Sequence, residues 1–353
     1  MKIITQSPVR PVKPQTAQPK RRITVWLKRI SLWLITGVVI LAVIGAAYQT
    51  IATQMDKRAY PPPGQMVDVG GYQMHLYCTG TNVDGRPTVI LENGLGSTSA
   101  AWALVQPEIA KATRVCSYDR SGMGWSDSSP EPRDAQHIAQ ELHTLLQNAK
   151  ISGPYVFVGW SIGGLYARGY AGQYSDEVSG LVLIDSSHPD QWTSTPDAVA
   201  QFESLAKMNS IAPALARLGV MRVMGLMQRA SGLPTPHNEA LKASFAAAKD
   251  WDAQSAEFLA WSVTAAQVHQ SKPLDNTPLF VLTATEHGTP STQEQLWQSW
   301  QTDLASLSTN SVHQIVDGAD HASFWRDPEN VKVSIAAILQ TVQSAHSGAP
   351  LNP

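Results

Sequence analysis

The sequence predicts an α/β fold with a largely parallel sheet covered by helices on both faces. Strand-like apolar runs alternate with helix-like segments along most of the chain, which is the order of a parallel sheet with helical crossovers. The later runs are continuously apolar rather than alternating, as expected for strands buried on both faces. The predicted strands cover 66–69, 72–77, 88–91, 114–118, 155–158, 180–184, 279–282 and 313–316.

A glycine pair and one amphipathic segment set the order of the first elements. Gly70-Gly71 separates the first two apolar runs, which predicts a β-hairpin. Residues 133–149 carry apolar side chains at helical spacing, so we expect a helix that lies on the sheet. Its apolar face is formed by Ile138, Leu142, Leu145 and Leu146.

The N-terminal part of the chain joins a basic segment to a long apolar run. Eight basic residues and no acidic residue precede Ile30, and the run from Ile30 to Tyr48 carries no charge. Nineteen helical residues extend about 28 Å, close to the hydrocarbon thickness of a bilayer. We expect an uncleaved anchor, with Trp26, Trp33 and Tyr48 at the membrane interfaces. A cleaved signal peptide is the alternative, because Gly45-Ala46-Ala47 offers a small-residue exit, although the apolar run is long for one.

These features divide the chain into five parts. With the basic flank in the cytoplasm, the folded body is periplasmic or extracellular and the N-terminal helix contacts the membrane. After Arg29 the chain has 18 basic and 28 acidic residues, so it lacks the basic cluster that binds nucleic acid. The parts are a basic cytoplasmic tail (1–29), a transmembrane anchor (30–49), a proline-rich spacer (50–65), an α/β core (66–189 and 276–345) and a helical cap insertion (190–275).

The predicted insertion over 190–275 has no strand-like run and is rich in Ala, Leu and Met. Flexible methionines adapt to varied apolar shapes, so one interpretation is a lid that lines an acyl pocket. The other is an ordinary helical subdomain whose methionines fill its core, and the sequence leaves both open. The methionines are Met208, Met221, Met224 and Met227.

A candidate nucleophile lies in Gly159-Trp160-Ser161-Ile162-Gly163. The apolar run 155–158 precedes this segment and a helix-like run follows it. Strand, G-x-S-x-G and helix together predict a sharp turn that holds Ser161 as an exposed nucleophile, with Trp160 next to the substrate. The glycines allow strand and helix to approach closely around the turn.

A serine hydroxyl needs a base, and the base needs an acid to orient it. His321 follows the last predicted strand, where a loop can present its imidazole to the serine turn, whereas His313 lies inside that strand. Two residues compete as the acid. Asp185 directly ends the strand 180–184 and is the favoured candidate, and Glu286, after the next strand, is the alternative.

Two backbone amides are expected to bind the negatively charged oxygen of a tetrahedral intermediate. The Ile162 amide opens the helix after the serine, where backbone donors are unpaired. The second donor comes from the loop Asn93-Gly94-Leu95-Gly96 after the strand 88–91, and we assign the Leu95 amide.

A longer motif adds a family resemblance. Residues 118–127 read Tyr-Asp-Arg-Ser-Gly-Met-Gly-Trp-Ser-Asp. With the serine turn, they resemble the α/β-hydrolase superfamily, in its esterase- and acyltransferase-like branch with Y-D-R-x-G-x-G-x-S-D. The resemblance covers about residues 66–343 and implies Ser161 as nucleophile, His321 as base, and Asp119 and Arg120 as structural residues. A serine rather than an aspartate at the elbow argues against haloalkane dehalogenases and epoxide hydrolases.

The chain departs from that family in two places. Asn93-Gly94 stands where many members have His-Gly, and Ala284-Thr285-Glu286-His287 replaces the usual Gly-x-x-Asp. The second departure supports Asp185, an acid position that some members use. The family's strand order also implies that the strands of Cys78 and Cys116 are neighbours. The two cysteines therefore form a disulfide or remain buried free thiols, and the sequence does not decide which.

The sequence therefore predicts a membrane-anchored serine hydrolase that cleaves an ester-like bond, with amide and thioester bonds as alternatives, of a small apolar acyl substrate through an acyl-enzyme. No metal or organic cofactor is implied, because no H-E-x-x-H or cysteine-rich pattern occurs. The alternatives are an acyltransferase, a cofactor-free lyase or peroxidase on the same triad, and a non-catalytic binding protein that keeps the fold.

Overall fold

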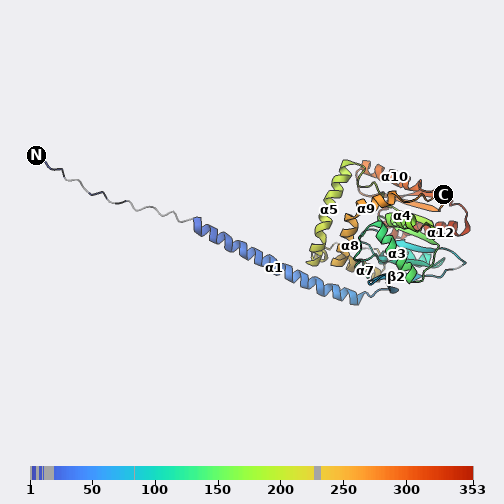
Figure 1. Cartoon of the computed structure of the whole chain (residues 1–353), viewed down its shortest axis with the longest axis horizontal. Helices are drawn as coiled ribbons and strands as arrows, with labels where there is room; N and C mark the ends of the chain where they lie inside the picture. The colour runs from blue at the N-terminus through green and yellow to red at the C-terminus, as the bar shows by residue number, and fades with distance from the viewer. Residues whose placement is uncertain are drawn as a thin grey trace.

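The computed structural model describes residues 2–4, 8–9, 11, 20–82, 84–225 and 232–352. Met227 lies outside these residues. In the described part, a long N-terminal helix leads into a body built on one twisted sheet (Figure 1). The hydrolase-type α/β architecture predicted from the strand and helix order is therefore confirmed.

Eight strands form the sheet in the order β1-β2-β4-β3-β5-β6-β7-β8. β1 and β2 form the predicted hairpin, β2 pairs antiparallel with β4, and all other neighbours are parallel. The carboxyl ends of β3 to β8 therefore lie at one edge, where ligands bind in such sheets. The strands are β1 (Gln65–Asp68), β2 (Gln73–Thr79), β3 (Thr88–Glu92), β4 (Val115–Tyr118), β5 (Tyr155–Trp160), β6 (Val178–Ile184), β7 (Leu279–Glu286) and β8 (Ser311–Asp320).

Helices cover both faces of the sheet because consecutive strand residues point to opposite sides. In β5, Val156 and Val158 pack with α11 and α12, whereas Tyr155 and Phe157 pack with α3 and α4. The covering helices are α2 (Gln106–Ile109), α3 (Ala135–Asn148), α4 (Gly163–Gln173), α10 (Ser291–Ala305), α11 (Ser323–Arg326) and α12 (Pro328–Ser347), with short 3-10 turns at Ser99–Leu104 and Ser175–Glu177.

The described residues between β6 and β7 contain helices, turns and loops but no strand, and they form a cap. Thr195 caps the first of its helices by accepting a hydrogen bond from the Ala198 amide, and Pro196 occupies the first helical position. Met221 is buried in the cap, whereas Met208 and Met224 are exposed. The cap helices are α5 (Pro196–Arg217), α6 (Val220–Val223), α7 (Thr235–Ala246), α8 (Ala248–Leu259) and α9 (Trp261–His269).

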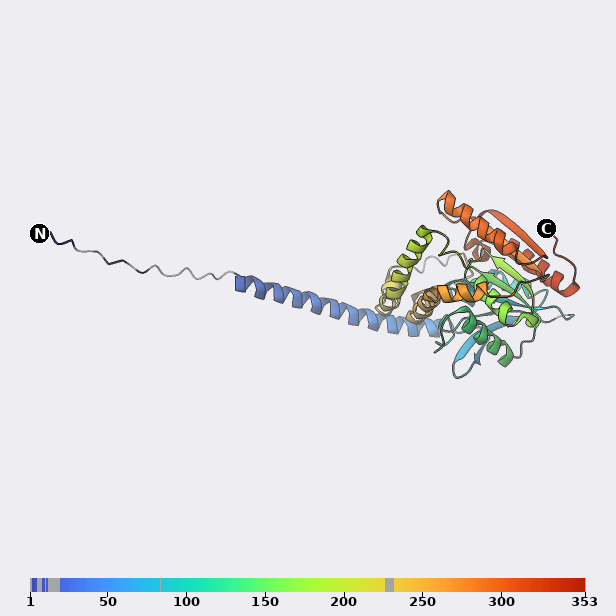
Figure 2. The ribbon, with the colours of Figure 1, turned by 45° about the horizontal axis from the view of Figure 1, so that its top comes forward.

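The N-terminal helix α1 (Lys20–Ala59) extends away from the body (Figures 1 and 2). Within the described residues, its segment Val25–Ala59 is the one helix long and apolar enough to cross a membrane. The helix continues past Tyr48 to Ala59, so irregular chain begins only at Tyr60 rather than across the whole expected spacer 50–65. Residues 49–59 are mostly good helix formers, and the helix ends just before the prolines at 61–63.

Cys78 and Cys116 are joined by a disulfide. They are directly opposite each other in the antiparallel pair of β2 and β4, with their Cα atoms 4.0 Å apart. The bond links the N-terminal hairpin to the strand beside β3.

Candidate active site

Ser161 lies on the turn between β5 and α4. Its backbone has φ +58°, a conformation that non-glycine residues rarely adopt, so the turn is strained. The Ser161 amide donates to the Ile184 carbonyl oxygen (3.2 Å), and the Ser161 carbonyl accepts from the Gly164 amide (3.0 Å). A Cβ on Gly163 would lie 2.6 Å from the backbone oxygen of Asn93, which explains the need for glycine beside the serine.

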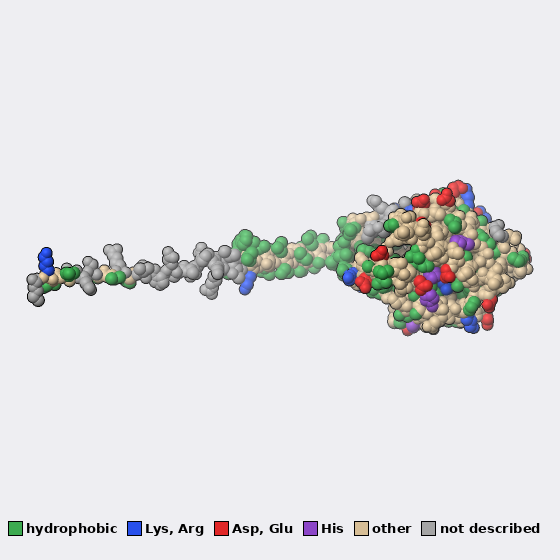
Figure 3. Space-filling model, turned by 90° about the horizontal axis from the view of Figure 1, so that it is seen from above, with side chains coloured by type: hydrophobic (Ala, Val, Ile, Leu, Met, Phe, Trp, Pro, Cys, Tyr) green, Lys and Arg blue, Asp and Glu red, His purple; other side chains and the backbone are tan. Residues whose placement is uncertain are grey.

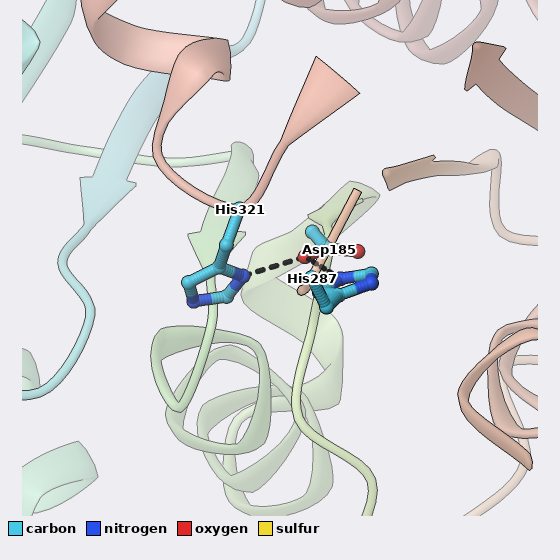
Figure 4. Close-up of side chains that lie close together, drawn as sticks. All are labelled: Asp185, His287 and His321. Carbon is cyan, nitrogen blue, oxygen red and sulfur yellow. Dashed lines mark hydrogen bonds and ion pairs between the residues drawn. The ribbon is translucent and has the colours of Figure 1, made fainter. Parts of the chain in front are cut away.

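His321 directly follows β8, and two contacts fix its position. Its Nδ1 lies 2.5 Å from Oδ2 of Asp185, which directly follows β6 (Figure 4). Its carbonyl accepts a hydrogen bond from the Trp160 indole (2.7 Å), and the two rings are 5.0 Å apart between centroids. Because Trp160 precedes Ser161, the serine and the imidazole lie at the same edge of the sheet.

Four groups hold the buried carboxylate of Asp185. The Ala284 amide (3.1 Å) and the Trp297 indole (2.8 Å) donate to Oδ1, and ring nitrogens of His321 and His287 contact Oδ2. Burial alone would raise the pKa of Asp185, but the hydrogen bonds and charges of His287 and His321 outweigh it and hold the pKa well below its usual range. Asp185 is therefore an anion at neutral pH.

His287 is the residue that the sequence analysis missed as part of this site. Its Nε2 lies 2.8 Å from Asp185 Oδ2, and its Nδ1 lies 2.9 Å from a carboxylate oxygen of Glu294 on α10. An ionised carboxylate only accepts hydrogen bonds, so both ring nitrogens donate and the ring is a cation. Burial opposes this charge, but the two carboxylates raise the pKa of His287 to about 9.

The other two acid and base candidates are not hydrogen-bonded to this cluster among the described residues, although Glu286 lines the same cavity as His287 and His321. Glu286 is exposed at the end of β7, and no hydrogen bond joins its side chain to His321 or His287 in the part of the chain that the structure describes. His313 lies inside β8, where its Nε2 contacts the Thr283 hydroxyl (2.8 Å).

Among the described residues, Asp185, His287 and His321 form a group whose side chains could together bind a metal ion. Their ligand atoms lie within 4.8 Å of one another. In a tetrahedral zinc site with bonds of about 2.0–2.1 Å, ligand atoms are about 3.3 Å apart. Here two nitrogens contact the same carboxylate oxygen at 2.5 and 2.8 Å, which is the geometry of two hydrogen bonds. The distances therefore favour two histidines hydrogen-bonded to one carboxylate over three ligands arranged around a metal ion.

Arg120 holds the loop after β3 against the serine. Its guanidinium, 1% exposed, donates to the carbonyl oxygens of Asn93 (2.6 Å) and Gly94 (2.9 Å) and pairs with Glu92 and Glu257. Glu257 comes from α8, so the cap supplies part of this support. A network of buried charges thus fixes where the carbonyl groups of the loop point.

The loop also lies close to Ser161. A Cβ on Gly94 would come within 2.5 Å of the Trp160 ring and 3.2 Å of the Ser161 Cβ, so only glycine fits there. The Leu95 and Ile162 amides donate to no acceptor among the described residues. Two backbone donors without partners, close to a serine, form a place where an oxyanion can bind.

A cavity of about 480 Å³ opens beside His321, between the start of the cap and α10. Three tryptophans, Trp192, Trp297 and Trp300, line it together with His287, His321 and several polar side chains. The side chains of Leu95 and Ile162 pack in a neighbouring apolar cluster with Trp192 and Phe202. By contrast, Trp160 is 9% exposed and packs against Trp325 rather than lining this cavity.

Comparisons with known proteins extend these observations. Residues 87–328 match the family model described as the alpha/beta hydrolase fold. An uncharacterized vacuolar membrane protein of Saccharomyces cerevisiae is 34% identical over 134 residues, which are 34% of this chain and 21% of that protein. A pimeloyl-[acyl-carrier protein] methyl ester esterase of Vibrio atlanticus is 36% identical over 107 residues, 30% of this chain and 39% of that protein.

A solved structure shows the same fold. The thermophilic esterase of Thermogutta terrifontis superposes with a TM-score of 0.56 at 20% identity, covering 79% of this chain and 99% of that one. The chain matches about a fifth of the length of the yeast relative. Because the family model spans most of the sheet and the whole cap, from β3 to the residue before Glu329, the chain belongs to the alpha/beta hydrolase fold family.

Proposed function

We propose that this protein is a serine hydrolase that cleaves an ester-like bond through a covalent acyl-enzyme. One observation supports this most strongly: the Asp185–His321 pair lies against Trp160, the neighbour of Ser161 on its strained turn. An acid paired with a base, close to a serine, is what a serine nucleophile needs for activation, and transfer of the serine proton to His321 is part of the proposal.

In the proposed reaction, Ser161 Oγ attacks the substrate carbonyl carbon while His321 Nε2 accepts the hydroxyl proton. Asp185 accepts the His321 Nδ1–H hydrogen bond, which fixes the tautomer and stabilises the imidazolium that forms. The Leu95 and Ile162 amides donate to the oxyanion. His321 then returns the proton to the leaving alcohol, and water releases the acyl group by the same steps in reverse order.

The proposed substrate carries an apolar acyl or alcohol group. The apolar side chains around the two amides and the three tryptophans in the cavity beside His321 support this choice. The name of the Vibrio relative, a methyl ester esterase, points to the same bond type. Trp160 serves in this proposal as a positioning residue for His321, in place of the substrate contact expected from the sequence.

The proposal places the hydrolase body at a membrane. The apolar helix α1 and the vacuolar membrane protein among the relatives support membrane association. The basic residues before Ile30 favour a cytoplasmic N-terminus, with the body on the opposite side.

The test is covalent labelling of the full-length protein with a fluorophosphonate probe. We expect labelling of the wild type and of Ser299→Ala, an exposed serine on α10, and loss of labelling in Ser161→Ala. Turnover of p-nitrophenyl esters of increasing acyl length should fall to background in the same variant. Equal labelling of wild type and Ser161→Ala would refute the proposal.

A further inference from the structure

Helix α5 and its last turn have two apolar sides. One side buries Ala212 and Ala216 against α8 within the cap. The other side is open to solvent in the described structure, and a stripe of this kind indicates an interaction surface. We call it the α5 stripe; it consists of Met208, Ile211, Leu215 and Leu218, which are 60%, 56%, 36% and 38% exposed.

The position of Leu218 shows how far along α1 this stripe reaches. The backbone oxygen of Leu218 lies so close to Gly45 that a Cβ there would clash. Gly45 belongs to the uncharged run that ends at Tyr48. At 1.5 Å per residue, Gly45 lies about 4.5 Å inside the end of that run. The C-terminal end of the α5 stripe is therefore level with the last part of the apolar segment of α1.

Polar contacts just beyond that level hold the cap to α1. Arg222 pairs with Asp56 (2.7 Å) and donates to the Gln49 side chain (3.1 Å), and Gln49 donates to the Ala246 carbonyl (2.6 Å). These contacts fix the position of the cap along the axis of α1. Val223, at the end of α6, is 76% exposed on the same part of the cap.

The views agree on the orientation of α5. It crosses α1 instead of running along it in both ribbon views (Figures 1 and 2). Figure 3 shows hydrophobic side chains along α1 and on the end of the body where α1 meets it. A helix that crosses a membrane-spanning helix lies along the membrane surface.

We propose that the α5 stripe, together with Val223, docks into the lipid surface of the leaflet next to the hydrolase body. This inference depends on α1 crossing the membrane and is independent of the chemistry of Ser161. Amphipathic helices of this kind lie about 5–10 Å deep at the boundary of headgroups and acyl chains, which agrees with the depth given by Gly45. Lys207, exposed beside the stripe, can extend its ammonium group to lipid phosphates.

The test measures the surroundings of spin labels on the full-length protein in phosphatidylcholine–phosphatidylglycerol vesicles. Ile211→Cys and Leu215→Cys carry a nitroxide on the α5 stripe, and Ser210→Cys carries it on the exposed polar flank of the same helix. No described cysteine is free, so the label attaches to the introduced residue. We expect collisions with a water-soluble nickel chelate to be roughly threefold or more lower at 211 and 215 than at 210, with oxygen collisions higher.

Two results would overturn the proposal. Nickel collisions at 211 and 215 equal to those at 210 would put the stripe in water. Low collision rates with both reagents, relieved when the protein is diluted in lipid, would show that a second copy covers it. Circular dichroism of each labelled variant checks the fold, and Met208→Cys gives a third position on the stripe.

Discussion

Two imidazole rings share one oxygen of Asp185, but only one of them has a carboxylate on each ring nitrogen. His287 lies between Asp185 and Glu294, and its ring centroid is 6.3 Å from that of His321. Both rings therefore depend on one carboxylate, and the residue after β7 helps to hold the acid that orients the proposed base.

Asp185→Asn tests which acid serves His321. The amide cannot hold the same tautomer or stabilise the imidazolium, so we expect kcat to fall roughly 10⁴-fold. Glu286→Gln is the matched control, because Glu286 is exposed and makes no hydrogen bond to His321 in the described residues. Steady-state kinetics with a p-nitrophenyl ester distinguishes the two. A large loss in Glu286→Gln with activity kept in Asp185→Asn would reverse the assignment.

His287→Gln should lower kcat/KM. The substitution removes the ring whose Nε2 lies 2.8 Å from Asp185 Oδ2, so the carboxylate that orients His321 is held less firmly. The measurement is steady-state kinetics with a p-nitrophenyl ester, with Glu286→Gln as the control. An unchanged kcat/KM in His287→Gln would show that the proposed triad works without this histidine.

The same histidine predicts a pH dependence of stability. Its pKa of about 9 in the folded protein exceeds the ordinary value of 6.5, so the folded state holds the proton more tightly. Its contribution is fully present below about pH 6.5 and is lost as the pH rises through 9. Thermal unfolding of the wild type should lose stability across this range, and His287→Gln should lose less.

The contact between α8 and the loop after β3 depends on buried charges. Arg120, from the turn after β4, joins Glu92 on β3 to Glu257 on α8, and all three side chains are at most 1% exposed. The cap is therefore tied to the loop whose amides are proposed to bind the oxyanion. Movement of α8 would shift these amides relative to Ser161.

Arg120→Met would leave two buried carboxylates without their partner. A broken buried ion pair costs about 3–5 kcal/mol, and we expect a loss of that size in the free energy of unfolding. Urea denaturation measures it. Lys111→Gln, which removes an exposed pair with Glu108, is the control and should change stability by less than about 1 kcal/mol. Similar small losses in both variants would show that the network contributes little.

Sequence patterns predicted the elements better than the contacts between them. The strand runs, the hairpin and the position of Asp185 at a strand end follow from local apolarity and turn residues. The links from His287 to Asp185 and from Glu257 to Arg120 join residues 102 and 137 positions apart. The first contact arises only when β7 lies beside β6, and the second only when α8 of the cap packs over the turn after β4. The predicted N-terminal helix ended at residue 49, where polar residues begin. The helix continues to Ala59 because residues 49–59 have good helix propensity.

The whole molecule joins a long apolar helix to an α/β body through a segment that stays helical up to Ala59. Gln49 is 4% exposed and bonded to the cap, although it lies ten residues before the end of α1. The folded body therefore begins inside this helix, before the prolines at 61–63. Residues 49–59 belong to the body as much as to the anchor.

Two truncated proteins test this boundary. A chain starting at Tyr60 loses both Gln49 and Asp56 and leaves the largely buried Arg222 without either partner. We expect it to be less stable by about 2 kcal/mol or more than a chain starting at Ala47, because an unpaired buried charge is costly. Thermal unfolding compares them, and equal melting temperatures would contradict this view of the boundary.

Because α1 is continuous from its apolar segment into the part bonded to the cap, it also affects how the proposed enzyme encounters its substrate. From Lys20 to Ala59, α1 has no proline, and Gln49 near its C-terminal end is bonded to the cap. With α1 across the membrane as proposed, the proposed catalytic edge would stay at a constant distance from the lipid. For a substrate dissolved in the same bilayer, encounter becomes a two-dimensional search. Turnover would then follow the mole fraction of substrate in the vesicle and would not change when the suspension is diluted with buffer.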